Sequence, residues 1–180
     1  MKEYNIPKTI DAKEIKSIRK EFGMTQKEFA ELIGCSKPTV ERWETSETKI
    51  TGPVVLLLKL MAEHSEWMTE LEIPPKILPL RMWYMYKEKR CTLIDVDDRN
   101  EVVQIKNYTK NTLFTAFGHE KHPTYEDYCD FLKSRCFPET RDKIKLELDR
   151  LGIPFYDPML IIKKTQGRMA EDDFWILLEE

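Results

Sequence analysis

Basic and hydroxyl side chains of the kind that contact nucleic acid gather between residues 27 and 49. Arg42 can donate two parallel hydrogen bonds to the O6 and N7 atoms of guanine, and Lys37 can reach the same acceptors. Thr39 can bind a base or a phosphate, while Pro38 offers apolar contact to a thymine methyl group. Further candidates for phosphate contact are Lys27, Thr48 and Lys49. This chemistry requires a rigid element that presents these side chains outward.

Two short helices joined by a tight turn are predicted to supply that element. Thr25 and Glu28 have the spacing of a capping box, which fixes where the first helix begins. Gly34 suits the positive φ that ends this helix and opens the turn. Ser36 is expected to cap the second helix, and Pro38 lies in its first turn, where a missing N–H costs little.

Small and apolar residues in the same segment determine how the two helices cross. Ala30 must be small because the second helix passes close to it, while Val40 and Trp43 point back into the core. Glu41 is expected to be a surface charge or to orient Arg42. Six positions of the segment resemble the helix-turn-helix of the XRE/Cro family of phage-type repressors and of HigA- and MqsA-like antitoxins: Gln26, Ala30, Gly34, Ser36, Val40 and Glu44.

The resemblance covers about the first third of the chain and implies an all-α bundle of four to five helices. It also implies that the second helix enters the major groove and that Gln26 clamps a phosphate at the start of the first helix. Asp11 is expected to cap a helix before the motif. After the motif, Gly52 and Pro53 start an apolar helix over residues 54–61. Its leucines are expected to cover the core: Leu56, Leu57 and Leu60.

Prolines mark the expected limit of this bundle. Residues 73–79 read IPPKILP, and three prolines stop any helix and favour extended chain. We therefore expect a helix-turn-helix domain over residues 1–72, a proline-rich linker over residues 73–79, and a dimerisation or partner-binding domain over residues 80–180.

The last of these domains is expected to be a small α+β unit, which makes the whole chain α+β. Residues 91–96 and 101–108 are rich in strand formers and flank a polar run, a pattern typical of a β-hairpin. Residues 80–86 fit a third strand or a helix. Later helices are expected to begin after Thr124 and Asp157, because each residue can cap the helix that follows it. An acidic and aromatic segment over residues 170–178 is expected to dock onto the domain.

Residues 134–153 and 171–176 carry a second resemblance. They read SRCFPETRDKIKLELDRLGI and EDDFWI, and they are similar to a short accessory module ahead of the kinase core in some HipA-like toxins. The kinase core itself is absent, because the chain offers no glycine-rich phosphate loop, paired lysine or catalytic aspartate. The resemblance implies a recognition or regulatory surface in place of a catalyst.

Composition excludes a mostly membrane-buried protein. Charged residues make up 34% of the 180 residues, and the longest apolar run is far shorter than the roughly 20 residues that cross a bilayer. The first residues lack the pattern of an export signal. We expect a cytoplasmic protein with no membrane partner, whose four cysteines stay as thiols.

The net charge of −3 is unusual for a DNA-binding protein, because neutralising phosphates normally supplies much of the affinity. Residues 1–53 hold ten basic and nine acidic residues, so the acidic excess lies in the rest of the chain. A weakly basic face predicts modest affinity for each protomer and hence binding as a dimer.

Other candidate sites have simpler structural explanations. One string resembles a zinc site, but its C-x6-C spacing is loose and a buried thiol packs as a small apolar group. The carboxylates of residues 171–173 point in different directions and fit a solvated turn or helix start. No Walker loop, nucleophile elbow or dinucleotide fingerprint occurs. We therefore expect no metal, no cofactor and no enzyme. The residues of the zinc-like string are His119, His122, Cys129 and Cys136.

The leading hypothesis is a transcriptional repressor that binds an inverted-repeat operator in double-stranded DNA as a homodimer. A more specific version is an antitoxin that represses its own operon and neutralises a toxin through residues 80–180. The alternative is a protein-interaction adaptor whose helix-turn-helix does not read DNA, which the acidic balance favours. An enzyme built on the second domain ranks last.

Overall fold

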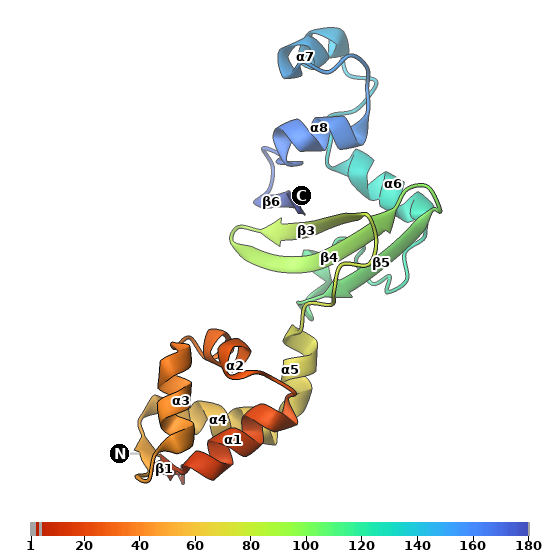
Figure 1. Ribbon diagram of the computed structural model, residues 1–180. Coiled ribbons are helices and arrows are strands. Elements are labelled where there is room, and N and C mark those ends of the chain that lie inside the picture. Colours follow the sequence, from red (N-terminus) through yellow and green to blue (C-terminus); the bar gives the residue numbers. More distant parts are fainter. Residues whose placement is uncertain (1–2, 4, 180) are drawn as a thin grey trace. The chain divides into compact units, whose positions relative to one another are not determined.

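The computed structural model of the chain describes residue 3 and residues 5–179. It divides into two compact units, Met1–Glu72 and Ile73–Glu180, which Figure 1 shows in red to yellow and in green to blue. Each unit has its own buried core. The described residues form eight α-helices and two β-sheets, so the α+β class expected from the sequence is confirmed.

The first unit is a helical bundle with one small sheet. Its described helices are α1 (Ala12–Glu21), α2 (Gln26–Leu32), α3 (Lys37–Thr45), α4 (Pro53–Glu63) and α5 (Ser65–Leu71). The strands β1 (Thr9–Ile10) and β2 (Ile50–Thr51) pair antiparallel. This pairing ties the segment before α1 to the segment after α3.

Capping boxes begin the first two helices, where the sequence predicts a box at Thr25 and a cap at Asp11. The Asp11 side chain accepts a hydrogen bond from the backbone N–H of Glu14, and the Glu14 carboxylate accepts one from the N–H of Asp11. At α2, the Thr25 N–H donates to the Glu28 carboxylate at 2.7 Å, and the Glu28 N–H donates back to the Thr25 hydroxyl. Gly34 has φ +70° directly after α2, which confirms the predicted turn.

The apolar face of α4 is not the one that the sequence predicts. Leu56, Leu57 and Leu60 are 37–41% exposed. The core side of this helix instead carries Val55, Leu58 and Met61. These residues recur every three positions, and they occupy the side opposite to the exposed leucines. Because α4 is apolar around most of its circumference, its sequence holds no polar stripe that marks the outer face.

The second unit contains a four-stranded antiparallel sheet in the order β5-β4-β3-β6. The predicted hairpin is confirmed as β4 and β5, and residues 80–86 form a central strand. The last segment of the sheet, β6, docks at its edge next to β3. The strand bounds are β3 (Leu80–Tyr86), β4 (Lys89–Asp97), β5 (Val102–Asn107) and β6 (Phe174–Glu179).

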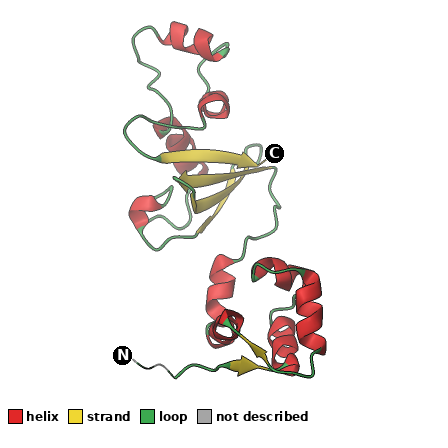
Figure 2. Ribbon diagram, turned by 90° about the vertical axis from the view of Figure 1, so that its left-hand side faces the viewer, coloured by secondary structure: helices red, strands yellow, loops and turns green. Residues whose placement is uncertain are grey.

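Three α-helices lie on one side of this sheet, as Figures 1 and 2 show. They are α6 (Tyr125–Ser134), α7 (Ile144–Leu151) and α8 (Pro158–Thr165), and a 3₁₀ helix η1 (Thr112–Phe114) precedes them. Thr124 and Asp157 cap α6 and α8 through their side chains, as expected. The core between helices and sheet includes Tyr128 and Ile162, which pack with Ile176 from β6.

Arg135 joins the end of α6 to the segment that leads into β6. Its buried guanidinium donates to the carbonyl oxygens of Gly167 and Phe174 and forms two hydrogen bonds with the Asp172 carboxylate, at 2.7 and 3.0 Å. The expectation of a merely solvated acidic turn over residues 171–173 is therefore wrong for Asp172. Its partner lies 37 residues away, which local sequence cannot indicate.

The zinc-like string gives no cluster of ligands. Within residue 3 and residues 5–179, no group of three or more histidine, cysteine, aspartate or glutamate side chains is arranged to hold a metal ion. His119 and His122 are exposed, whereas Cys136 is buried. Burial raises the pKa of the Cys136 thiol to about 12, so this sulfur stays protonated at neutral pH. No helix in the described part of the chain has the length and apolar character needed to cross a bilayer.

Candidate nucleic-acid interface

The helix α3 has one inward and one outward face. Val40 is fully buried and Trp43 is half-buried, and both pack in the core of the first unit. Lys37, Pro38 and Arg42 are exposed. The structure thus separates the core residues of α3 from the predicted base-contacting residues, and we refer to α3 as the recognition helix.

Arg42 and Lys37 differ in how their charges are compensated. Arg42 forms no ion pair with any of the residues that the structure describes, so its guanidinium is free to meet an acceptor. The Lys37 ammonium lies 3.1 Å from the Glu41 carboxylate. Glu41 therefore pairs with Lys37 and does not orient Arg42, which was one of its two expected roles. An exposed pair of this spacing is worth only about 0.3–0.5 kcal/mol, so Lys37 can exchange Glu41 for another anion.

Ser36 occupies the cap position of the recognition helix but makes no capping hydrogen bond with its side chain, contrary to the prediction. A capping hydroxyl normally accepts from the N–H two or three residues on. Pro38 has no N–H, and the N–H of Thr39 donates to the Ser36 carbonyl oxygen instead. The two hydroxyls of Ser36 and Thr39 lie 2.9 Å apart and bond to each other. Both remain at the end of the helix where bases would approach.

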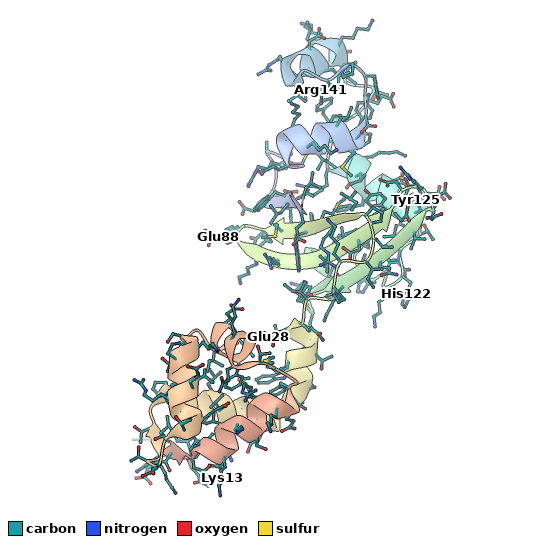
Figure 3. The ribbon with its side chains drawn as sticks, in the orientation of Figure 1. Lys13, Glu28, Glu88, His122, Tyr125 and Arg141 are labelled. Carbon is teal, nitrogen blue, oxygen red and sulfur yellow. The ribbon has the colours of Figure 1, made fainter. Side chains whose placement is uncertain are left out.

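Gln26 begins α2, but its side chain is turned toward the recognition helix. Its amide nitrogen donates to the Glu44 carboxylate at 2.9 Å. The contact of Gln26 with phosphate stays a prediction, and it would use the remaining amide groups of that side chain. The nearby Lys27 is exposed and lies 3.8 Å from Glu31. Figure 3 labels Glu28 in the same first turn of α2.

The loop after the recognition helix ends in Lys49, whose ammonium forms an ion pair with none of the residues that the structure describes. The hydroxyl of Ser46 donates to the carbonyl oxygen of Thr48, and the Thr48 N–H donates to that same hydroxyl. These bonds hold the loop in a defined turn. Lys49 is exposed next to it. The loop therefore places Lys49 beside the recognition helix, as the sequence suggests for phosphate contact.

A buried ion pair that sequence reasoning missed fixes the recognition helix. The guanidinium of Arg19 in α1 donates two hydrogen bonds to the Glu44 carboxylate in α3, at 2.6 and 3.0 Å. The same guanidinium donates to the carbonyl oxygen of Met24 at 2.7 Å. Only 12% of the Arg19 side chain and 4% of the Glu44 side chain are exposed. The bonds from Arg19 lower the pKa of Glu44 below its ordinary value, although burial opposes this shift.

The helix-turn-helix family model matches residues 15–58, which extend from α1 into α4. The N-terminal unit is an XRE-type helix-turn-helix domain. This confirms the resemblance that the spacing of six residues in the sequence indicates. The domain places Lys37, Pro38 and Arg42 on the outer face of its second motif helix.

The chain is also similar to a curated protein. The antitoxin HigA-2 of Vibrio cholerae serotype O1 is 39% identical over 62 residues. The similar region is 34% of this chain, and the chain spans 60% of the length of that relative. Together with the family match, this similarity supports the interpretation of the chain as an antitoxin-like regulator of the XRE type.

Proposed function

We propose that this chain is a sequence-specific DNA-binding transcriptional repressor. The observation that carries the proposal is the recognition helix itself. The Arg19–Glu44 pair holds this helix in place, while Arg42 is exposed and forms no ion pair within residue 3 and residues 5–179. An outward arginine on a rigid helix is suited to bidentate contact with guanine in the major groove. Lys27, Lys37 and Lys49 would add phosphate or base contacts around it.

The proposed repressor acts as a homodimer on an inverted repeat. Two recognition helices related by a two-fold axis would meet half-sites about 34 Å apart, one turn of the double helix. The weak positive balance of residues 1–53 supports this, because one protomer would gain only modest affinity from phosphate neutralisation. A protein that represses chromosomal genes must share their compartment, so we propose a cytoplasmic protein.

A more specific form of the proposal is an antitoxin. The similarity to HigA-2 supports it, since that relative is named as an antitoxin. In this form, residues 80–180 bind a protein partner, which would be the toxin of the same operon. The role is binding without catalysis. Co-purification of the chain with the product of the neighbouring gene would support this form, and its failure would leave the DNA-binding proposal intact.

The deciding experiment uses the Arg42→Ala variant of the full chain. DNA fragments selected by the wild-type protein from a random pool define the operator, and fluorescence anisotropy then measures the affinity of both proteins for it. We expect Arg42→Ala to lose about 1–3 kcal/mol of specific binding and to relax the preference at one base pair. Arg150→Ala is the matched control, because Arg150 is an exposed arginine in the second unit. Equal operator affinity of wild type and Arg42→Ala would remove Arg42 from the interface.

The alternative of a protein-interaction adaptor is favoured by the net charge of −3. It makes a different prediction for the same selection. An adaptor would enrich no DNA sequence from the random pool at physiological salt. A repressor would enrich a palindromic sequence.

A further inference from the structure

The outer edge of β6 is paired along only half of its length. In an antiparallel strand, alternate residues direct both N–H and C=O to the same side. Arg135 donates to the carbonyl oxygen of Phe174, and the Ile176 N–H donates to the carbonyl oxygen of Gln166 at 2.7 Å. These groups point away from β3, so the N–H and C=O of Leu178 must point the same way. Among the residues that the structure describes, neither group of Leu178 has a partner.

A groove lies directly beside this open half of the strand. Its volume is about 530 Å³, and it runs between the end of β6 and α8. The lining residues are Leu80, Ile162, Lys163, Gln166 and the four residues 176–179. In Figure 1, α8 lies next to β6, which is the edge strand of the sheet. We call this surface, the open edge at Leu178 and the lining residues together, the β6 groove.

The uncompensated charge of the β6 groove is positive. Lys163 is exposed and forms no ion pair within the described part of the chain. The Glu179 carboxylate lies on the opposite face of the sheet, where it accepts a hydrogen bond from the indole N–H of Trp83 at 2.6 Å, so it does not face the groove. Lys76 adds a second ammonium near the end of β6, 3.4 Å from the Glu179 carbonyl oxygen. An occupant with carboxylates would therefore match the groove better than a basic one.

We propose that the β6 groove binds an extended peptide segment of a partner protein, with alternating apolar and acidic residues, as an added strand. The backbone of the peptide would bond to the N–H and C=O of Leu178, as in other cases of strand addition to a sheet edge. Side chains alternate across an added strand, so the apolar ones would point toward α8 and fill the groove against Ile162 and Leu80. The carboxylates on the other side of the strand would be attracted by the ammonium groups of Lys163 and Lys76 at this edge. The inference rests on the proposed role of residues 80–180 in partner binding and names the surface for it.

Charge disfavours a second copy of this chain as the occupant. A two-fold axis at Leu178 would place both α8 helices on the same face of a continuous sheet. Each would carry Lys163 toward the seam between the two copies. Two like charges would then face each other, which opposes pairing.

The test replaces the outward N–H at Leu178. Proline is tolerated on an edge strand where its missing N–H faces outward, so Leu178→Pro removes one bond to the peptide and keeps the pairing of β6 with β3. Leu178→Ala is the matched control, because it removes a similar amount of side chain and keeps the N–H. The probe is a fluorescein-labelled synthetic peptide of alternating valine and glutamate, and anisotropy measures its binding to the full chain. We expect Leu178→Pro to bind about tenfold more weakly than Leu178→Ala.

Two further measurements do not depend on how well the proline variant folds. A valine–glutamate peptide that is N-methylated on its pairing edge should bind wild-type protein about tenfold more weakly than the unmodified peptide. Lys163→Glu should weaken binding of the valine–glutamate peptide and strengthen binding of a valine–lysine peptide. Lys145→Glu, on the separate helix α7, is the control for a general change in charge.

Several results would overturn the inference. Wild-type protein that fails to bind the valine–glutamate peptide would do so, and so would equal binding of the N-methylated and unmodified peptides. A wild-type dimer in sedimentation that Leu178→Pro converts to a monomer would assign the groove to a second copy. DNA affinity is measured in parallel, because Leu178→Pro should leave it unchanged. If the wild-type protein fails to bind DNA, the proposed repressor function is contradicted. If it binds DNA but not the peptide, only the proposed role of the β6 groove is contradicted.

Discussion

Arg19 and Glu44 place a structural ion pair directly behind the surface that would meet DNA. The Glu44 carboxylate accepts bonds from Arg19 and Gln26, so three segments of the first unit converge on one side chain. A base-contacting helix must be held to a fraction of an ångström, and second-layer bonds of this kind supply that rigidity. Glu44 therefore affects both the stability of the domain and the position of Arg42.

The stabilising effect of Glu44 should depend on pH. Because Arg19 lowers the pKa of Glu44 in the folded protein, its stabilisation is fully present above the ordinary pKa of about 4.3 and is lost as the pH falls further. We expect Glu44→Gln to destabilise the first unit by about 1–3 kcal/mol at pH 7 and to make its unfolding free energy less dependent on pH between about 5 and 3. Urea unfolding, followed by the NMR methyl signals of Ile15 and Ile18, measures this.

A control for this prediction is Glu47→Gln, which changes an exposed carboxyl in the loop after the recognition helix. Its unfolding free energy at pH 7 should differ from that of the wild type by no more than about 0.5 kcal/mol. Identical pH dependence in wild type and Glu44→Gln would show that the Arg19–Glu44 pair contributes no stability. The remaining slope in both proteins comes from other carboxyls of the first unit with lowered pKa, such as Glu28, whose pKa is lowered by its hydrogen bond from the Thr25 N–H.

Residue patterns predicted the caps but missed the ion pair. Capping depends on residues three apart, so Thr25 and Glu28 reveal it in the sequence alone. Arg19 and Glu44 are 25 residues apart, and each has the polarity of an ordinary surface residue. The Ser36 side chain does not cap α3 because Pro38 has no N–H to donate and the N–H of Thr39 donates to the Ser36 carbonyl oxygen. Sequence patterns therefore predict an interaction only where all of its partners lie close together in the sequence.

At the level of elements, helix starts were easier to predict than helix faces. In α1, α2 and α6, a side-chain cap identifies the first turn. The face of α4 was predicted wrongly because apolar residues surround most of this helix. Only packing against its neighbours, α1, α5 and β2, selects which of these residues are buried. The sequence of residues 80–86 fits both a strand and a helix. A strand in the middle of a sheet is apolar on both faces, so it lacks the alternation of apolar and polar residues that identifies strands.

The two sides of α4 should respond differently to truncation. Leu58 is fully buried, whereas Leu57 is 41% exposed. We expect Leu58→Ala to reduce the unfolding free energy of the first unit by about 2–5 kcal/mol, because it leaves a cavity. Leu57→Ala should change it by no more than about 0.5 kcal/mol. Urea unfolding of the two variants compares an identical chemical change on opposite faces, and equal effects would contradict the assigned orientation.

For the whole molecule, charge and symmetry together determine how DNA is bound. The acidic excess lies beyond residue 53, while residues 1–53, which hold the recognition helix, are close to neutral. Phosphate contacts are therefore few, and two protomers must combine theirs. The proposed dimer links this electrostatic property to the expected inverted repeat.

Binding stoichiometry and salt dependence should reflect this. We expect two chains to bind each palindromic operator and a single half-site to bind at least about tenfold more weakly at physiological salt. Sedimentation of the complex gives the stoichiometry, and a salt titration of Lys27→Ala should show a slope reduced by about one. Tight binding of a single chain to one half-site at physiological salt would contradict the dimer.

The position of β3 between β4 and β6 has a consequence during synthesis. Tyr84 pairs with Thr92 on one side and with Ile176 on the other, so the second neighbour leaves the ribosome about ninety residues later. Until then, one flank of a nearly continuous apolar strand stays open in the nascent chain. A product cut short before residue 174 would keep that flank permanently. Such fragments should be the ones that chaperones retain or that aggregate.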